Sequence, residues 1–303
     1  DFIAEAVDDP NTKVILCYIE DVTHGSEFLK VVAEATRKKP VVILKSGTSQ
    51  SGALAASSHT GALAGSDLAY NTAFKRCGVL RVTNMSDLFD LAISFVNQPL
   101  PKGDRVAIVT NSGGPGIIAT DRIEAHGLQM ARFAKETIEE LRSYMPAEAG
   151  IYNPVDVLGD AKTDRFSFAF EKVFKDENVD SIVMMMCPVA VTEPVDTARS
   201  LIEFSRRYPE KTVITAMMGG KSLAEGAALL SSSGIPCFSM PEPAIAAIAG
   251  MSAYKKLKER PAAEERTTDF RPDLKTVKAI FYDVKRDGRL ALLGSEAAEV
   301  VSA

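Results

Sequence analysis

The sequence predicts an α/β protein with two doubly wound parallel sheets. Short apolar runs rich in β-branched residues alternate with amphipathic stretches along nearly the whole chain. Such runs are typical of buried parallel strands, and the stretches between them are typical of helices that cover both faces of a sheet. Residues 99–104 (PLPKGD) interrupt this alternation, which then restarts. We therefore expect a domain boundary near residue 100.

The first domain is expected at residues 1–99. Its predicted strands are residues 13–19, 40–45 and 79–82, with helices between them. The domain opens directly on a helix and has only three clear strands, which suggests that a strand and helix precede it in a longer chain.

The second domain is expected at residues 100–258. Its predicted strands are residues 105–110, 181–186, 212–217 and 236–239. Residues 259–303 begin with a charged, proline-bearing stretch that is typical of a linker. Two helices are predicted beyond it, at 274–287 and 296–302, and this tail is too short for a domain of its own.

Composition excludes several functional classes. The 303-residue chain has a net charge of −5, which argues against nucleic acid as the main partner. It contains no apolar run long enough for a membrane span and no N-terminal secretory signal, so we expect a cytoplasmic protein. The four cysteines do not form close pairs, so neither a metal site nor a disulfide framework is expected.

The first candidate site is a run of small residues, Ser46–Gly65, between a predicted strand and the next helix. We predict a long loop here, and long ordered loops usually have a function. Backbone N–H groups and hydroxyls of Ser, Thr and Gly can surround an anion. His59 has the only ring in this run, and its neighbours Ser58, Thr60 and Gly61 are candidates for phosphate contacts.

His59 is our candidate for a residue that carries a phosphoryl group. Neutral imidazole is a good nucleophile near pH 7, and it needs a partner on its other ring nitrogen to fix the tautomer. Glu20 is the candidate partner because it follows a strand at the carboxyl edge of the sheet, where doubly wound folds bind ligands. Asp21 stands beside it as an alternative. Alternatively, His59 is a loop histidine that is hydrogen-bonded only to backbone.

The second candidate site is a glycine-rich turn between a predicted strand and helix. Free N–H groups and the dipole at a helix start attract phosphate. The candidate phosphate-binding residues of this turn are Asn111, Ser112, Gly113, Gly114 and Gly116. The spacing is neither G-x-G-x-x-G nor a Walker loop, and a tight turn without a ligand is the alternative. In the later segment NPVDVLGDA, Asp156 and Asp160 are expected to serve turns rather than a metal.

Together these segments resemble the nucleotide-diphosphate-forming acyl-CoA synthetases, relatives of succinyl-CoA synthetase. SHTGALAGSD (Ser58–Asp67) is similar to the phosphohistidine loop of that family, with His59 at the phosphorylated position. YIE (Tyr18–Glu20) is similar to the segment that supplies the paired carboxylate, and VTNSGGPG (Val109–Gly116) to a turn that holds the phosphate. The resemblance covers essentially the whole chain and implies two flavodoxin-like domains.

The resemblance also implies a reaction and its partners. The family converts acyl-CoA, ADP and phosphate into a carboxylic acid, CoA and ATP, through an acyl phosphate and a phosphohistidine. Its members also have a CoA-binding domain and an ATP-grasp domain, so we expect this chain to be an inactive fragment whose last residues lead into an ATP-grasp domain. Mg²⁺ is expected with the nucleotide in the full-length enzyme and no cofactor in the fragment. A homo-oligomer is compatible with the sequence.

Two other interpretations stay open. In some protein acetyltransferases the same domains act as a non-catalytic, acyl-CoA-sensing module, and these often lack the histidine that is present here as His59. A plain flavodoxin-like protein that binds nucleotide or flavin is the other alternative, although the absence of tryptophan and the few aromatic residues do not favour it.

Overall fold

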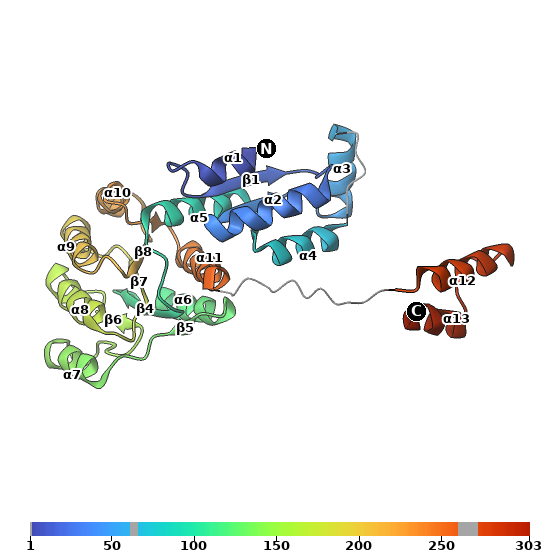
Figure 1. The fold of residues 1–303 in the computed structure, drawn as a ribbon. Helices are drawn as coiled ribbons and strands as arrows, with labels where there is room; N and C mark the ends of the chain where they lie inside the picture. The colour runs from blue at the N-terminus through green and yellow to red at the C-terminus, as the bar shows by residue number, and fades with distance from the viewer. Residues whose placement is uncertain (1, 61–65, 260–271) are drawn as a thin grey trace. The chain divides into compact units, whose positions relative to one another are not determined.

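A computed structural model describes residues 2–60, 66–259 and 272–303 of the chain. The chain forms two compact units, Asp1–Glu259 and Arg260–Ala303 (Figure 1). The first unit contains two parallel sheets, and the second contains two helices. The α/β fold with two doubly wound sheets is therefore confirmed. The predicted domain limits at residues 99 and 258 stay a prediction.

The first sheet has three parallel strands in the order β1-β2-β3. The strands are β1 (Ile15–Ile19), β2 (Val41–Lys45) and β3 (Leu80–Val82). The helices of this part are α1 (Phe2–Asp8), α2 (Gly25–Lys38), α3 (Gln50–Thr60), α4 (Asp67–Cys77) and α5 (Met85–Asn97).

Successive residues of β2 show why this sheet is covered on both faces. All five residues of β2 are buried. Val41 and Ile43 belong to a core with α1, α2 and α4, whereas Val42 and Leu44 belong to a second core with α5. Since side chains alternate across a strand, an uninterrupted apolar run fits a strand with helices on both sides.

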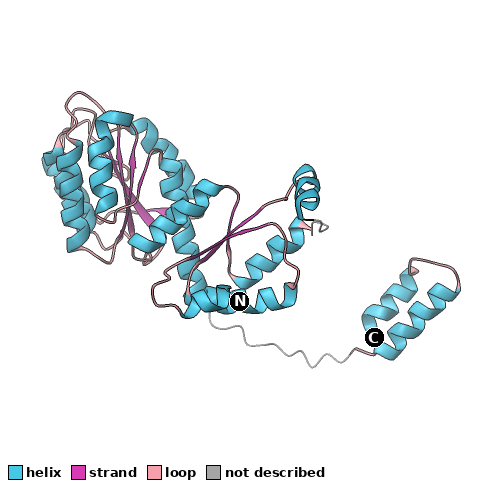
Figure 2. Cartoon of the chain, turned by 90° about the horizontal axis from the view of Figure 1, so that it is seen from above, coloured by secondary structure: helices cyan, strands magenta, loops and turns pink. Residues whose placement is uncertain are grey.

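The second sheet is also parallel, in the order β5-β4-β7-β8-β9, with β6 paired to β4. Figure 2 shows its strands, in magenta, between layers of helices. Its strands are β4 (Arg105–Thr110), β5 (Gln129–Met130), β6 (Val155–Asp156), β7 (Ser181–Met186), β8 (Thr212–Met217) and β9 (Cys237–Phe238). Its helices are α6 (Gly113–Ala125), α7 (Lys135–Tyr144), α8 (Thr163–Lys175), α9 (Pro194–Arg207), the 3₁₀ turn η1 (Gly220–Leu223), α10 (Ala224–Ser232) and α11 (Pro241–Glu259).

Helices α5 and α11 join the two sheets within the first unit. The rings of Phe95 and Tyr254 meet edge to face, with their centroids 5.6 Å apart. Gly250 allows the helices to approach closely, because a Cβ at this position would lie 2.4 Å from a methyl carbon of Leu91. Burial of these apolar faces against each other stabilises the arrangement of the two sheets.

The second unit is a pair of helices, α12 (Leu274–Arg286) and α13 (Gly294–Ser302), close to the two predicted there. Asp273 caps α12 by accepting hydrogen bonds from the N–H groups of Lys275 and Thr276. None of the helices described in either unit is long and apolar enough to cross a membrane. The predicted linker lies almost entirely outside the described residues.

Candidate functional site

The carboxyl edge of the first sheet brings the two candidate catalytic segments to one place. Ile19 and Lys45, the last residues of β1 and β2, are paired in register. The next residue after β2, Ser46, donates its N–H to the carbonyl oxygen of Ile19 at 3.0 Å. Glu20 follows Ile19 directly, so the candidate carboxylate and the segment that contains His59 leave the sheet side by side. The hydroxyl of Tyr18 donates to Glu20 Oε1 at 3.4 Å.

The histidine segment differs from the predicted loop. Residues Gln50–Thr60 form helix α3, and His59 lies in its last turn. Alanine favours helix more than any other residue, and Ser49 caps the helix by accepting the N–H of Gly52 at 3.1 Å. Local helix propensity therefore outweighs the tendency of Ser and Gly to form a loop.

The structure describes the residues around His59 only in part. Ser58 is exposed, and its hydroxyl donates to the carbonyl oxygen of Ala55 at 2.8 Å. The side chains of His59 and Thr60, and the whole of Gly61, lie outside the described residues. The phosphoryl-carrying role of His59 and the phosphate contacts of its neighbours therefore stay predictions.

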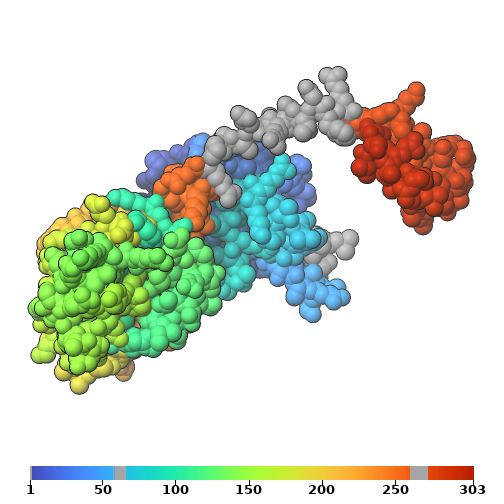
Figure 3. All heavy atoms as spheres, turned by 90° about the horizontal axis from the view of Figure 1, so that it is seen from below, coloured from blue at the N-terminus to red at the C-terminus, as the bar shows by residue number. Residues whose placement is uncertain are grey.

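Helix α3 stands clear of the helices that cover the sheet. Figures 1 and 2 show it beyond the strand ends, and in Figure 3 its atoms project from the surface. Among its described residues no side chain is buried, and Leu54 is 69% exposed. Packing along the helix therefore contributes little to its position.

A polar cluster that sequence analysis missed lies at the base of α3. Lys45 is only 4% exposed, and its ammonium lies 4.8 Å from the centroid of the Tyr70 ring. The hydroxyl of Tyr70 donates to Asp21 Oδ1 at 2.6 Å and accepts the N–H of Val22 at 3.0 Å. At the start of α4, Asp67 forms an ion pair with Arg81 of β3.

The pKa values of this cluster follow from burial and hydrogen bonding. Burial lowers the pKa of Lys45, and the nearby carboxylates of Asp21, Asp67 and Glu20 oppose this shift. Burial, reinforced by the bond to Asp21, raises the pKa of Tyr70 to about 12. The same bond, with the Val22 N–H, lowers the pKa of Asp21. A charged residue at the end of the apolar run of β2 was the one sequence signal for this cluster.

The glycine turn lies at the carboxyl edge of the second sheet. Ser112 is the N-cap residue of α6, but its hydroxyl makes no capping bond to that helix. Its own N–H donates to Thr110 Oγ1 at 3.0 Å. Gly113 and Gly114 in the first turn are exposed, whereas Gly116 is buried. Phosphate binding at this helix start stays a prediction.

Asn111 has a structural task in this turn. Its amide donates to the carbonyl oxygen of Cys187 and accepts the N–H of the same residue, both at 2.9 Å. The side chain thus ties the end of β4 to the end of β7. The predicted phosphate contact of Asn111 stays a prediction.

The segment after α7 forms turns and the short strand β6, which was not predicted and contains Asp156. The peptide bond between Asn153 and Pro154 is cis, and the Asn153 amide bonds the backbone of Val106, Ile108 and Ala131. Asp156 Oδ1 accepts the N–H of Leu158 at 2.9 Å. Asp160 pairs with Arg165, with 2.7 Å between oxygen and nitrogen.

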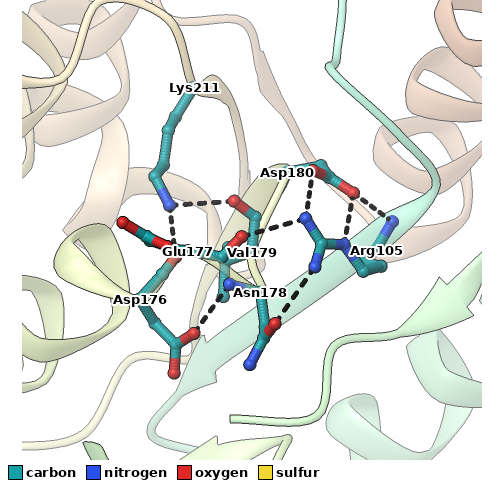
Figure 4. Close-up of polar contacts among 7 residues, drawn as sticks. All are labelled: Arg105, Asp176, Glu177, Asn178, Val179, Asp180 and Lys211. Carbon is teal, nitrogen blue, oxygen red and sulfur yellow. Dashed lines mark hydrogen bonds and ion pairs between the residues drawn. The ribbon is translucent and has the colours of Figure 1, made fainter. Parts of the chain in front are cut away.

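A second polar cluster lies at the amino edge of the second sheet (Figure 4). Asp180 is 5% exposed and accepts two side-chain bonds of 2.9 Å from Arg105, the first residue of β4. Lys211, which is 8% exposed, donates to the carbonyl oxygens of Asp176 at 2.6 Å and Val179 at 2.8 Å. Each cation in this cluster has buried protein partners, which is typical of a structural site.

Comparison with known families divides the chain in the same way as its two sheets. Residues 1–95 match the family described as a succinyl-CoA ligase-like flavodoxin domain. Residues 106–260 match the Ligase-CoA domain. The two matches include Glu20, His59 and the glycine turn.

Curated relatives and solved structures show the same likeness. The chain is 41% identical, over 88% of its length, to an ADP-forming acetate–CoA ligase of Archaeoglobus fulgidus and covers 37% of that protein. It is 37% identical, over 96% of its length, to an ADP-forming 4-hydroxybutyrate–CoA ligase of Nitrosopumilus maritimus and covers 42% of it. It also resembles the structure of acetyl-coenzyme A synthetase 1 of Ca. Korarchaeum cryptofilum in complex with phosphate and ADP, with a TM-score of 0.80 and 31% identity, covering 85% of this chain and 56% of that one.

Proposed function

Since this chain belongs to the family built from a succinyl-CoA ligase-like flavodoxin domain and a Ligase-CoA domain, we propose that it is part of an ADP-forming acyl-CoA synthetase. The observation that carries this proposal is the placement of Glu20 and the root of the His59 segment at one sheet edge. The chain spans about two fifths of the two curated relatives described above. We therefore propose that CoA and nucleotide bind to parts of the enzyme outside these 303 residues.

The proposed reaction has three steps. Phosphate attacks the thioester carbon of acyl-CoA, which releases CoA and forms an acyl phosphate. A ring nitrogen of His59 then attacks the phosphorus, which releases the carboxylate. Finally ADP takes the phosphoryl group from the histidine, which gives ATP and restores the neutral ring.

The residues of this chain would act mainly by position and charge. Glu20 would accept a hydrogen bond from the N–H of the second ring nitrogen and so fix the tautomer of His59. The N–H groups at the start of α6, next to Gly113 and Gly114, would stabilise charge on the phosphoryl group. The described residues contain no group of three or more His, Cys, Asp and Glu side chains placed to hold a metal. We propose that Mg²⁺ arrives with the nucleotide.

The proposal is tested with the full-length protein, γ-labelled ATP and Mg²⁺. We expect label that is acid-labile and base-stable on the wild type, and none on His59→Ala. Label on both proteins would place the phosphoryl group elsewhere. No label on either, in protein that binds acyl-CoA, would favour an acyl-CoA-sensing module.

A further inference from the structure

Lys45 occupies an unusual position for a lysine. It is the last residue of β2, directly before the segment that leads to His59, and it is 4% exposed. Its ammonium donates to the carbonyl oxygen of Ser46. The carboxylates of Asp21, Asp67 and Glu20 favour its charged form, but burial outweighs them and lowers its pKa. Burying this ammonium remains unfavourable despite these contributions, so its retention needs a reason.

Three chain segments meet at this ammonium. The first is the end of β1, where Ile19 precedes Glu20 and accepts the N–H of Ser46. The second is the entry into the histidine segment, which Lys45 holds through the Ser46 carbonyl. The third is α4, where the chain returns, because the Tyr70 ring lies under the ammonium.

The start of α4, where the chain returns to the sheet after the histidine segment, is held by contacts that do not involve Lys45. Tyr70 bonds Asp21 and the Val22 N–H, so α4 is tied to the residues that follow Glu20. Asp67 begins α4 and pairs with Arg81 of β3. Both ends of the histidine segment are therefore anchored to the same sheet edge, while α3 between them has no buried side chain among its described residues.

From this geometry we propose that Lys45 is a positioning residue, whose ammonium fixes the base from which His59 and Glu20 emerge. The inference rests on the proposed function, since it assumes that His59 carries the phosphoryl group. A small displacement of that base moves the reacting ring relative to the phosphorus, and misplacement of about 1 Å can cost 100-fold in rate. Lys45 does not itself touch the reacting atoms in this proposal.

The test compares Lys45→Met with Lys211→Met in the full-length protein. Both substitutions remove a buried ammonium of similar exposure, but Lys211 lies at the amino edge of the other sheet (Figure 4). We expect Lys45→Met to slow labelling of His59 from γ-labelled ATP by about 10- to 100-fold, with little change in KM for ATP. Lys211→Met should label at the wild-type rate per folded molecule. Lys45→Arg, which keeps a cation, should recover most of the rate.

The outcomes separate this inference from the proposed function. Wild-type protein that takes no label overturns the relay and the role of Lys45 in it together. If the wild type is labelled and Lys45→Met is labelled equally fast, only the role of Lys45 is overturned. An equal loss in Lys45→Met and Lys211→Met per folded molecule, as measured by circular dichroism, would show that both lysines are merely structural.

Discussion

The two buried lysines of this chain lie at strand ends of opposite kind. Lys211 precedes β8 at the amino edge of the second sheet, and two buried carbonyl oxygens accept its hydrogen bonds. Lys45 ends β2 at the carboxyl edge of the first sheet, and one carbonyl oxygen accepts from it in the described part of the chain. An ammonium has three hydrogens to donate, so the two environments differ in how far they satisfy it.

The neighbours of each lysine differ in the same way. At the amino edge Arg105 and Asp180 pair with each other, so each of these charges has a partner of opposite charge within the protein. At the carboxyl edge the charges of Asp21, Asp67 and Glu20 act on Lys45, and a segment with no buried side chain in its described part begins there. Doubly wound folds bind ligands at their carboxyl edges, so incomplete satisfaction at that edge is compatible with function.

The strongest expected effect on stability is at the amino edge. Arg105→Met would leave the carboxylate of Asp180 buried without its partner, so we expect the free energy of unfolding to fall by about 3 kcal/mol at pH 7. Labelling of His59 per folded molecule should not change. Urea denaturation followed by circular dichroism measures the first quantity.

The pH dependence of this loss has a definite sign. Burial alone would raise the pKa of Asp180, but Arg105 outweighs it and holds the pKa below its usual value. The contribution of Asp180 is therefore present above about pH 4, near its unfolded pKa, and is lost as pH falls through the folded pKa. The difference in the free energy of unfolding between wild type and Arg105→Met should therefore become smaller below pH 4. A gap that stays constant down to pH 2 would contradict this account.

Substitution of either buried lysine is expected to lower the free energy of unfolding by less than Arg105→Met, and by different amounts. Lys211→Met would remove two hydrogen bonds to buried carbonyl oxygens, those of Asp176 and Val179, and we expect a loss of about 2 kcal/mol. Lys45→Met would leave one carbonyl and remove a poorly compensated charge, so the expected loss is about 1 kcal/mol or less. Stability and labelling would then rank the two variants in opposite orders. The same order in both measurements would remove the contrast between the two edges.

Long apolar runs made most of the fold predictable from the sequence. Residues 105–110, 181–186 and 212–217 were expected as strands and form β4, β7 and β8. The two-residue strands β5 and β6 were missed because two residues show no periodicity.

The candidate site was predictable only where a residue is adjacent to a strand end. Glu20 could be placed because the carboxyl ends of parallel strands meet at one edge. The contact between Lys45 and Tyr70 could not, because it joins a strand to a helix across a segment whose geometry the sequence does not reveal. Helix α3 was predicted as a loop because Ser and Gly are typical of loops, but its alanines favour helix.

Tyr70→Phe tests the anchor on the return side of the histidine segment. The substitution removes the bonds to Asp21 and Val22 but keeps the ring under Lys45, so we expect a loss of about 1 kcal/mol at pH 8. The pKa of Tyr70 is raised from about 10 to about 12, so its contribution is full below pH 10 and is lost as pH rises towards 12. Urea denaturation of wild type and Tyr70→Phe at pH 8 and pH 11 checks this. A difference in the free energy of unfolding that grows with pH would refute it.

The smallest effect on stability is expected for Ser112 in the glycine turn. Its neighbour Asn111 is hydrogen-bonded through its side chain, and Ser112 makes no capping bond. The amide of Asn111 donates one hydrogen bond to Cys187 and accepts one from it, so Asn111→Ala should cost about 2 kcal/mol. The hydroxyl of Ser112 makes no capping bond to α6, so Ser112→Ala should change stability by less than about 0.5 kcal/mol. If that hydroxyl is kept for phosphate, Ser112→Ala should nevertheless slow labelling of His59 by about tenfold. Urea denaturation and label incorporation on the same protein samples decide the matter, since unchanged labelling would leave Ser112 with no part in phosphate binding.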